Sequence, residues 1–347
     1  MDARQRARYT GSEDGVRLPR LFMLQNARIH RRVEGALTYP TVSPRRRRQE
    51  KLRKCIRYRQ LYLLLLLPVF AVFFFHYVPI YGLQIAFRKY QPSKGIWGSS
   101  WAGLKYFKMW LGSNIFETAL GNTLRISIKC LVIGFPVPII FALLVNRVKN
   151  ALFRTGVQYI AYIPNFISTV VLVSMMSIFF ANNGLVNIVA RFMGVQETIT
   201  YANADQFDMI YVISGIWQAM GFNSIIYVAA LSAVDPGLYE AAKLDGASTM
   251  RIMWHIDLPA MMPTILMMLI LNIGNLLGVA HDKVLLMQTG TNIMQTEIIS
   301  TYVYKIGVAQ AQYSYSTAIG LFNAVVNFAL LLAANLITKK TTSSGLF

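Results

Sequence analysis

Long apolar runs alternate with short polar segments along most of the chain, and this pattern predicts a helical membrane protein. About 20 consecutive apolar residues cross the hydrocarbon core of a bilayer as an α-helix. Six stretches meet this length: 61–87, 121–146, 157–181, 207–232, 261–281 and 316–337. Since a backbone in lipid must satisfy its own hydrogen bonds, we expect an all-α membrane protein with six transmembrane helices.

Several of these stretches contain prolines, at positions 68, 79, 136, 138 and 164. A proline inside a helix removes one backbone donor and kinks or breaks the helix. Within the bilayer, freed backbone groups are tolerated where they face protein or a water-filled cavity. The prolines therefore favour a bundle that forms a pathway over a simple anchor, although a kinked helix that only packs against its neighbours would contain them as well.

The polar segment 235–263, between the fourth and fifth apolar stretches, predicts two short helices joined at a glycine. Asp235 can accept hydrogen bonds from the free N–H groups of a first turn, and Pro236 pre-sets the first helical φ. Gly246 is expected to end or bend this helix. A second helical run, 247–256, should follow it.

One feature of this segment indicates a docking surface, and a second indicates where the segment ends. Glu240 places one acidic side chain beside two very small ones, Ala241 and Ala242, so this face can enter a partner's groove with a single charge to orient it. Pro259 and Pro263 are expected to interrupt the helix before the next apolar stretch.

Composition agrees with membrane insertion and offers little chemistry. Hydrophobic residues make up 55% of the chain and charged residues 14%, whereas about a quarter of the residues in soluble domains are charged. Cys55 and Cys130 have neither a disulfide framework nor a metal-ligand spacing. The sequence has no G-x-x-x-x-G-K-[ST] phosphate loop, and its histidines are scattered: His30, His76, His255 and His281. We expect no catalytic residue, no metal site and no cofactor bound by this chain.

The net charge of +19 is concentrated at the N-terminus. Residues 1–60 hold 17 Lys/Arg and 5 Asp/Glu, and we expect a basic cytoplasmic arm here, with the first 44 residues partly disordered. Nine of the basic residues directly precede the first apolar run: Arg45, Arg46, Arg47, Arg48, Lys51, Arg53, Lys54, Arg57 and Arg59. Beside a span, such a cluster favours contact with anionic lipid over nucleic acid. No cleavable signal peptide is apparent, and Met23 is an alternative start.

Charge bias predicts the sidedness of the spans. With the N-terminus inside, the nine juxtamembrane residues and the cytoplasmic segments 147–156, 233–260 and the tail hold 16 Lys/Arg, and the segments on the outer side hold 8. This distribution follows the positive-inside rule. It places segment 235–263 and the tail 339–347 in the cytoplasm. The six-span domain itself is expected to cover residues 61–338.

The segment that contains Glu240-Ala241-Ala242, then Gly246, then Leu258 and Pro259 resembles the cytoplasmic coupling loop of binding-protein-dependent ABC importer permeases. Segments 94–107, 214–242 and 312–335, with the ending 345–347, are similar to the maltose-type superfamily of these permeases. Within it they are most similar to the branch that imports complex oligosaccharides and polysaccharides. The likeness covers about residues 58–347.

The resemblance implies an assembly and a set of coupling residues. The partners would be a second related permease, so a heterodimer, two ATPase subunits that use ATP and Mg, and an extracytoplasmic solute-binding protein. The complex would lie in the bacterial cytoplasmic (inner) membrane and work by alternating access. The residues expected to dock on the ATPase are Tyr239, Glu240, Ala241, Ala242, Asp245, Gly246, Leu258 and Pro259.

A transporter of hydroxyl-rich solutes needs polar side chains that face an interior cavity. The candidates for the substrate pathway are Asn165, Trp217, Asn223, Tyr227, Asn272 and Asn275, with Ser224, Asn323 and Asn327 as further candidates. Trp217 and Tyr227 would offer surfaces on which a sugar stacks. Alternatively, the amides hydrogen-bond between helices and touch no substrate.

Basic residues on the outer side run against the charge bias. Segment 88–118 carries five Lys/Arg and one acid, and Arg125 and Lys129 continue this outer collar into the second span. One hypothesis is that the collar attracts an anionic substrate, such as uronate oligosaccharides from alginate or pectin. The alternatives are contact with an acidic binding protein or with lipid headgroups, and a neutral oligosaccharide or other small solute as the substrate.

Two readings from other classes are a non-ABC membrane transporter and a membrane assembly factor. A proton- or sodium-driven transporter usually places ionisable residues in the middle of its spans, but here Asp and Glu avoid the span centres. An enzyme or assembly factor would need a reactive cluster that the sequence lacks.

Overall fold

The computed structural model describes residues 57–342 and divides the chain into two units, Met1–Val78 and Pro79–Phe347. The prediction that the first 44 residues are partly disordered and the predictions for most of the basic arm and for the last five residues of the tail lie outside the described part. In the first unit, α3 (Arg59–Val72) runs through Pro68 without a break and continues as a π turn, η2 (Phe73–Tyr77).

Among the described residues, five helices are long and apolar enough to cross a membrane: Arg59–Phe87, Asn114–Asn146, Ala204–Ser232, Thr249–Gly274 and Tyr313–Lys340. A sixth candidate consists of Ala151–Phe166 and Thr169–Phe179, which meet at an angle of 98°. The prediction of a helical membrane protein is thus confirmed. The count of six spans stays a prediction, because it requires the bent pair to act as one span.

The second unit begins with a small hairpin region. The 3-10 helix η3 (Val78–Phe87) leads across the unit boundary into β1 (Arg88–Gln91), η4 (Pro92–Lys94), α4 (Gly95–Gly98), β2 (Ser99–Trp101) and α5 (Lys105–Leu111). The two strands pair antiparallel, with Arg88 opposite Trp101. This two-stranded hairpin is an addition to the all-α class that the sequence predicted.

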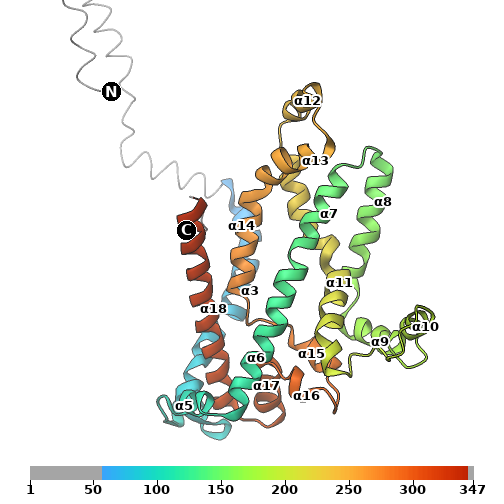
Figure 1. Cartoon of the computed structure of the whole chain (residues 1–347). Helices are drawn as coiled ribbons and strands as arrows, with labels where there is room; N and C mark the ends of the chain where they lie inside the picture. The colour runs from blue at the N-terminus through green and yellow to red at the C-terminus, as the bar shows by residue number, and fades with distance from the viewer. Residues whose placement is uncertain (1–56, 343–347) are drawn as a thin grey trace, which may run out of the picture. The chain divides into compact units, whose positions relative to one another are not determined.

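The long helices follow in chain order. They are α6 (Asn114–Lys129), η5 (Cys130–Gly134), α7 (Pro136–Asn146), α8 (Ala151–Tyr162), η6 (Ile163–Phe166), α9 (Thr169–Phe179), α10 (Leu185–Phe192) and α11 (Ala204–Ser232). After them come α12 (Pro236–Leu244), α13 (Thr249–Ile252), η7 (Met253–Asp257), α14 (Leu258–Gly274), α15 (His281–Met287), α16 (Ile293–Thr296), α17 (Ile299–Tyr304), η8 (Lys305–Ala309) and α18 (Tyr313–Thr342). Figure 1 shows α12 at one end of this unit and α5, α16 and α17 at the other.

Prolines have two different effects on these helices. Thr249–Gly274 is one continuous helix, so the expectation that Pro259 and Pro263 interrupt it is wrong. The π turn η7 directly precedes Pro259, so the change in hydrogen-bond spacing falls where the proline removes one backbone donor from the continuous helix. Pro164, by contrast, lies in η6, and after it Ser168 starts a new helix by accepting a hydrogen bond from the Val171 N–H.

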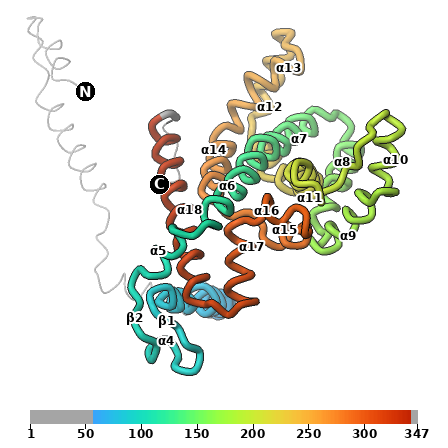
Figure 2. The backbone as a smooth tube through the Cα atoms, turned by 60° about the horizontal axis from the view of Figure 1, so that its bottom comes forward, coloured from blue at the N-terminus to red at the C-terminus, as the bar shows by residue number. Residues whose placement is uncertain are grey.

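Helix α11 is the centre of the second unit and packs against α7, α8 and α14. Figure 2 shows it with α7 and α8 beside it. Gly221 allows the close crossing with α8, because a Cβ at this position would lie 2.2 Å from the carbonyl oxygen of Ala161. A buried apolar cluster on one side of α11 includes Phe207 and Tyr211, and a second includes Tyr227 and Leu231.

Candidate transport cavity and coupling loop

The first helix of the coupling segment has the start and the end that the sequence predicts. Asp235 Oδ1 accepts a 2.9 Å hydrogen bond from the Gly237 N–H, and α12 begins at Pro236. Gly246 has a φ of +70°, and the Ala247 N–H donates to the Ala242 carbonyl at 2.9 Å, which closes the helix end. The second helix differs from the prediction, because α13 continues through η7 into α14 instead of stopping.

Most residues proposed for docking are accessible at this end of the unit. Helix α12 has no buried residue. Exposed side chains or backbone are found at Glu240, Ala241, Asp245, Gly246 and Pro259, whereas Tyr239, Ala242 and Leu258 are half-buried. Leu258 packs beside the cluster of Tyr227 and Leu231, so it contributes to the core as well as to the surface.

An ionic cluster joins this segment to the neighbouring span. Asp257 is fully buried, and its carboxylate forms an ion pair with Arg147 at the end of α7. The Tyr239 hydroxyl donates to Asp257 Oδ1 at 2.7 Å, and the Arg147 guanidinium lies 5.1 Å from the centre of the Tyr239 ring. Three segments that are distant in sequence therefore meet at one carboxylate.

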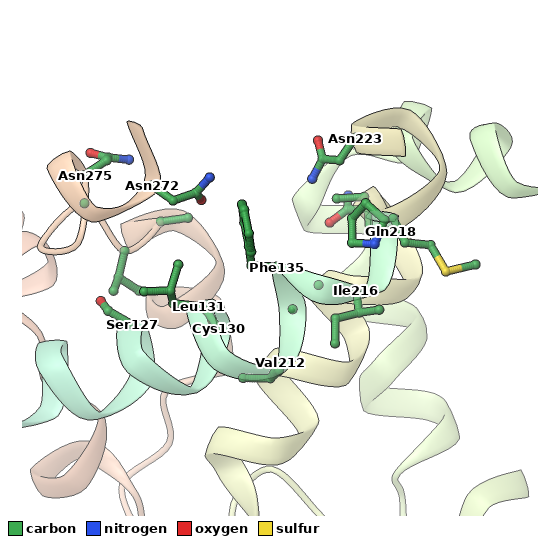
Figure 3. Close-up of a pocket in the computed structure, with 18 of the residues that line it drawn as sticks. Ser127, Cys130, Leu131, Phe135, Val212, Ile216, Gln218, Asn223, Asn272 and Asn275 are labelled. Carbon is green, nitrogen blue, oxygen red and sulfur yellow. The ribbon is translucent and has the colours of Figure 1, made fainter. Parts of the chain in front are cut away.

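A cavity of about 530 Å³, lined by apolar and polar side chains, lies beside α11. Its walls come from the α6–η5–α7 span, from α11, from α14 and from the segment that leads into α15. The polar side chains that line it are Ser127, Tyr211, Gln218, Asn223, Tyr227, Asn272, Asn275 and Lys283. In Figure 3, Phe135 stands between Asn272 and Asn275 on one wall and Gln218 and Asn223 on the other.

The structure brings together four of the six residues proposed for the substrate pathway. Asn223, Tyr227, Asn272 and Asn275 line the cavity, although three helical elements separate them in sequence. Trp217 is half-exposed on α11 and is not a lining residue, and Asn165 lies in η6 away from the lining.

The three further candidates serve helix packing. Ser224 is fully buried and donates to the Gly221 carbonyl within α11. Asn327 accepts a hydrogen bond from the Leu277 N–H at 3.0 Å, and Asn323 donates to the Leu277 carbonyl at 3.4 Å. These two amides hold the chain just after α14, which is the role of an amide between helices.

The two collar residues within the second span share one carboxylate. Asp208 on α11 has a side chain that is 4% exposed; Lys129 Nζ lies 2.7 Å from its Oδ2, and Arg125 Nε lies 2.8 Å from the same atom. Arg125 also donates to the Gln295 carbonyl at 2.5 Å. Both basic groups remain more than one third exposed. Because two cations share one carboxylate, this part of the collar keeps a net charge of about +1, and the two ion pairs link α6 to α11.

Sequence analysis missed Lys283, Gln218, Ser127 and Phe135 as lining residues. Lys283 follows the fifth apolar stretch directly, and by sequence it counted as one of the outer basic residues. A signal that could have revealed it is its position close after the Asn272 and Asn275 pair. Asp257 was not predicted either. Its position just before an apolar run was the signal that could have marked it as a buried acid.

Membrane-length helices around a cavity with several amide side chains, with a short exposed helix at one end, are the architecture expected of a membrane transport protein. The chain belongs to the family of binding-protein-dependent transport system inner membrane components, whose model matches residues 134–343. It is therefore the permease type of subunit, in agreement with the resemblance read from its sequence, and the non-ABC alternatives are excluded.

Named relatives agree with this assignment. The chain is 43% identical over 87% of its length to the Bacillus subtilis polygalacturonan/rhamnogalacturonan transport system permease protein YteP, covering 94% of it. It is 30% identical, over 79% of the chain and 85% of the relative, to the arabinooligosaccharides transport system permease protein AraP of the same species.

A solved structure has the same fold. It is a crystal structure of a bacterial ABC transporter involved in the import of the acidic polysaccharide alginate, with a TM-score of 0.75 and 35% identity over 84% of this chain and 99% of that one. A second structure of a bacterial alginate ABC transporter, in complex with an alginate pentasaccharide-bound periplasmic protein, matches with a TM-score of 0.76 and 34% identity over 85% and 99% of the two chains.

Proposed function

We propose that this chain is the permease subunit of an ATP-driven importer for oligosaccharides derived from acidic polysaccharides. The observation that supports an oligosaccharide importer most strongly is the cavity, where Asn223, Tyr227, Asn272 and Asn275 converge from α11 and the end of α14, and the acidic class of substrate is supported by the relatives. Two relatives reinforce it, since one is named for polygalacturonan and rhamnogalacturonan and the other for alginate, all of which contain uronic acids.

The lining suits a sugar in size and in chemistry. A volume of about 530 Å³ falls within the range of about 300–1,000 Å³ for small-molecule sites. An amide side chain carries donors and an acceptor that can bind sugar hydroxyls, and one donor of Asn272 is already bound to the Met268 carbonyl at 2.8 Å. Phe135 and Tyr227 provide ring surfaces in the same cavity, against which the apolar face of a sugar ring can pack.

The proposed assembly contains a second related permease, two ATPase subunits and an extracytoplasmic solute-binding protein. Helix α12 would dock on an ATPase subunit in the cytoplasm, with both chain termini on that side. Its exposed face and its attachment to Arg147 and Asp257 suit a rigid lever. Closure of the ATPase dimer would then move α7 and α14 together, and the cavity would open alternately to each side.

Reconstitution of the complete importer in proteoliposomes tests the proposal. The purified chain should bring down an ATPase and a second permease. ATP hydrolysis should be stimulated by the cognate binding protein loaded with oligogalacturonate or oligoalginate. An assembled importer that responds only to neutral oligosaccharides would refute the acidic substrate class, and failure to capture an ATPase would refute the assembly.

A neutral oligosaccharide is the second candidate substrate. It is favoured by the pairing of Arg125 and Lys129 with Asp208, which leaves less free positive charge for an anion, and by the number of uncharged amides in the cavity. The same panel of acidic and neutral sugars distinguishes the two candidates.

A further inference from the structure

Lys283 is a buried lysine in the wall of the transport cavity. It lies in the first turn of α15 and is 5% exposed. Its Nζ donates a 2.9 Å hydrogen bond to the Tyr211 carbonyl and lies 4.5 Å from the centre of the Tyr211 ring. Lys283 is a lining residue of the cavity, and its Nζ would lie 3.4 Å from a Cβ placed on Gly215, which lines the same cavity.

Four other basic side chains of the described helices have acidic partners. Arg125 and Lys129 share Asp208, Arg147 pairs with Asp257, and Lys305 pairs with Glu297. Within residues 57–342, by contrast, no carboxylate lies within ion-pair distance of Lys283. An ammonium group has three donors, and the Tyr211 carbonyl accounts for one of them.

A buried cation without a counter-charge is unfavourable, and chains retain such groups mainly for function. Burial lowers the pKa of Lys283 to about 8, so the side chain is still mostly protonated at neutral pH. The amides of the cavity cannot supply a negative charge. An anion that enters the cavity would supply both the missing charge and the missing acceptors.

We propose that Lys283 binds the carboxylate of a uronic acid residue of the transported oligosaccharide, while the surrounding amides bind its hydroxyl groups. This inference rests on the proposed function and names the residue that selects acidic over neutral sugars. An ammonium–carboxylate hydrogen bond is stronger than one between neutral groups, and a neutral sugar would leave the ammonium unpaired.

Binding measurements on the purified membrane complex of two permeases and two ATPase subunits, in the absence of the binding protein, test this role. The two ligands are trigalacturonate and the same trisaccharide with its carboxyl groups reduced to alcohols. Lys283→Met should weaken binding of the acidic ligand by about tenfold and change binding of the neutral one less than twofold. Lys283→Arg should keep most of the acidic binding, and Lys340→Met, which removes an exposed lysine from the last turn of α18, should change neither.

Equal losses for both ligands in Lys283→Met would overturn the proposal, as would no loss for either. Thermal unfolding of the variant complex controls for misfolding, and Lys283→Arg keeps the test valid if the methionine variant does not assemble. A wild-type importer that binds and transports neither ligand would instead refute the proposed function.

The pH profile gives a second readout. Lysine loses its charge as pH rises through its pKa, so wild-type binding of trigalacturonate should fall above about pH 8, whereas binding by Lys283→Arg should stay level, because arginine remains charged. The titratable groups that face Lys283 are Tyr211 and Cys130; on its own helix, His281 and Asp282 pair with each other. A parallel fall in both proteins would assign the effect to another group and contradict the proposal.

Discussion

The Tyr239 hydroxyl donates a 2.7 Å hydrogen bond to Oδ1 of the buried Asp257 carboxylate. Tyr239 lies on α12, and Asp257 is the last residue of the π turn that leads into α14. This contact therefore ties the proposed docking helix to the long helix that forms one wall of the cavity. A movement of α12 would reach α14 through this bond as well as through the chain.

Tyr239→Phe should weaken the link between ATP hydrolysis and transport. The variant loses one buried hydrogen bond, which contributes about 1 kcal/mol, while the Arg147–Asp257 ion pair stays. We expect fewer sugars transported per ATP hydrolysed in proteoliposomes, with assembly retained. Tyr159→Phe is the matched control, since Tyr159 is exposed on α8. An unchanged transport-to-hydrolysis ratio in Tyr239→Phe would contradict a coupling role.

Removal of either partner of the Arg147–Asp257 pair should destabilise the protein. Asp257→Leu leaves a guanidinium that is only 20% exposed without its counter-charge, and breaking such a pair costs about 3–5 kcal/mol. The double variant Arg147→Met, Asp257→Leu should recover part of this loss, because no unpaired charge remains. Thermal unfolding in detergent measures both, and strictly additive losses would show that the pair is not coupled.

Gly246→Leu should disrupt the end of α12. The backbone at Gly246 has a φ of +70°, a conformation that is unfavourable by about 1–2 kcal/mol for residues with a Cβ. We expect reduced assembly with the ATPase or uncoupled hydrolysis. Gly246→Asn is the control, because asparagine tolerates this region better. Normal substrate-stimulated ATPase activity in Gly246→Leu would refute the assignment of this turn to coupling.

Arg125→Gln and Lys129→Gln test the collar against its structural role. If the collar attracts anionic substrates, each variant should reduce transport of acidic oligosaccharides more than that of neutral ones. Equal reductions in the transport of acidic and neutral oligosaccharides would refute the hypothesis. The double variant leaves the buried Asp208 without a partner, so its loss of thermal stability should exceed the sum of the two single losses. Additive losses would show that the two cations do not share Asp208 energetically.

The sequence by itself determined the features that depend on neighbouring residues. The apolar runs gave the membrane-length helices, Asp235 and Pro236 gave the start of α12, and Gly246 gave its end. Polar side chains in the spans also led to Asn223, Tyr227, Asn272 and Asn275, which line the cavity, while their role in a substrate pathway stays a prediction. The local features agree with the structure because helix length, capping and side-chain polarity act over one or two turns.

Only the tertiary structure decided how distant side chains pair. It placed Arg125 and Lys129 on Asp208, turned Asn323 and Asn327 toward the backbone of Leu277, and put Lys283 in the cavity wall with no ion-pair partner among residues 57–342. It also carried the helix past Pro259 through a π turn and bent the chain after Pro164. The physical reason is that these outcomes depend on how each helix is rotated and crossed against its neighbours, which no local pattern specifies.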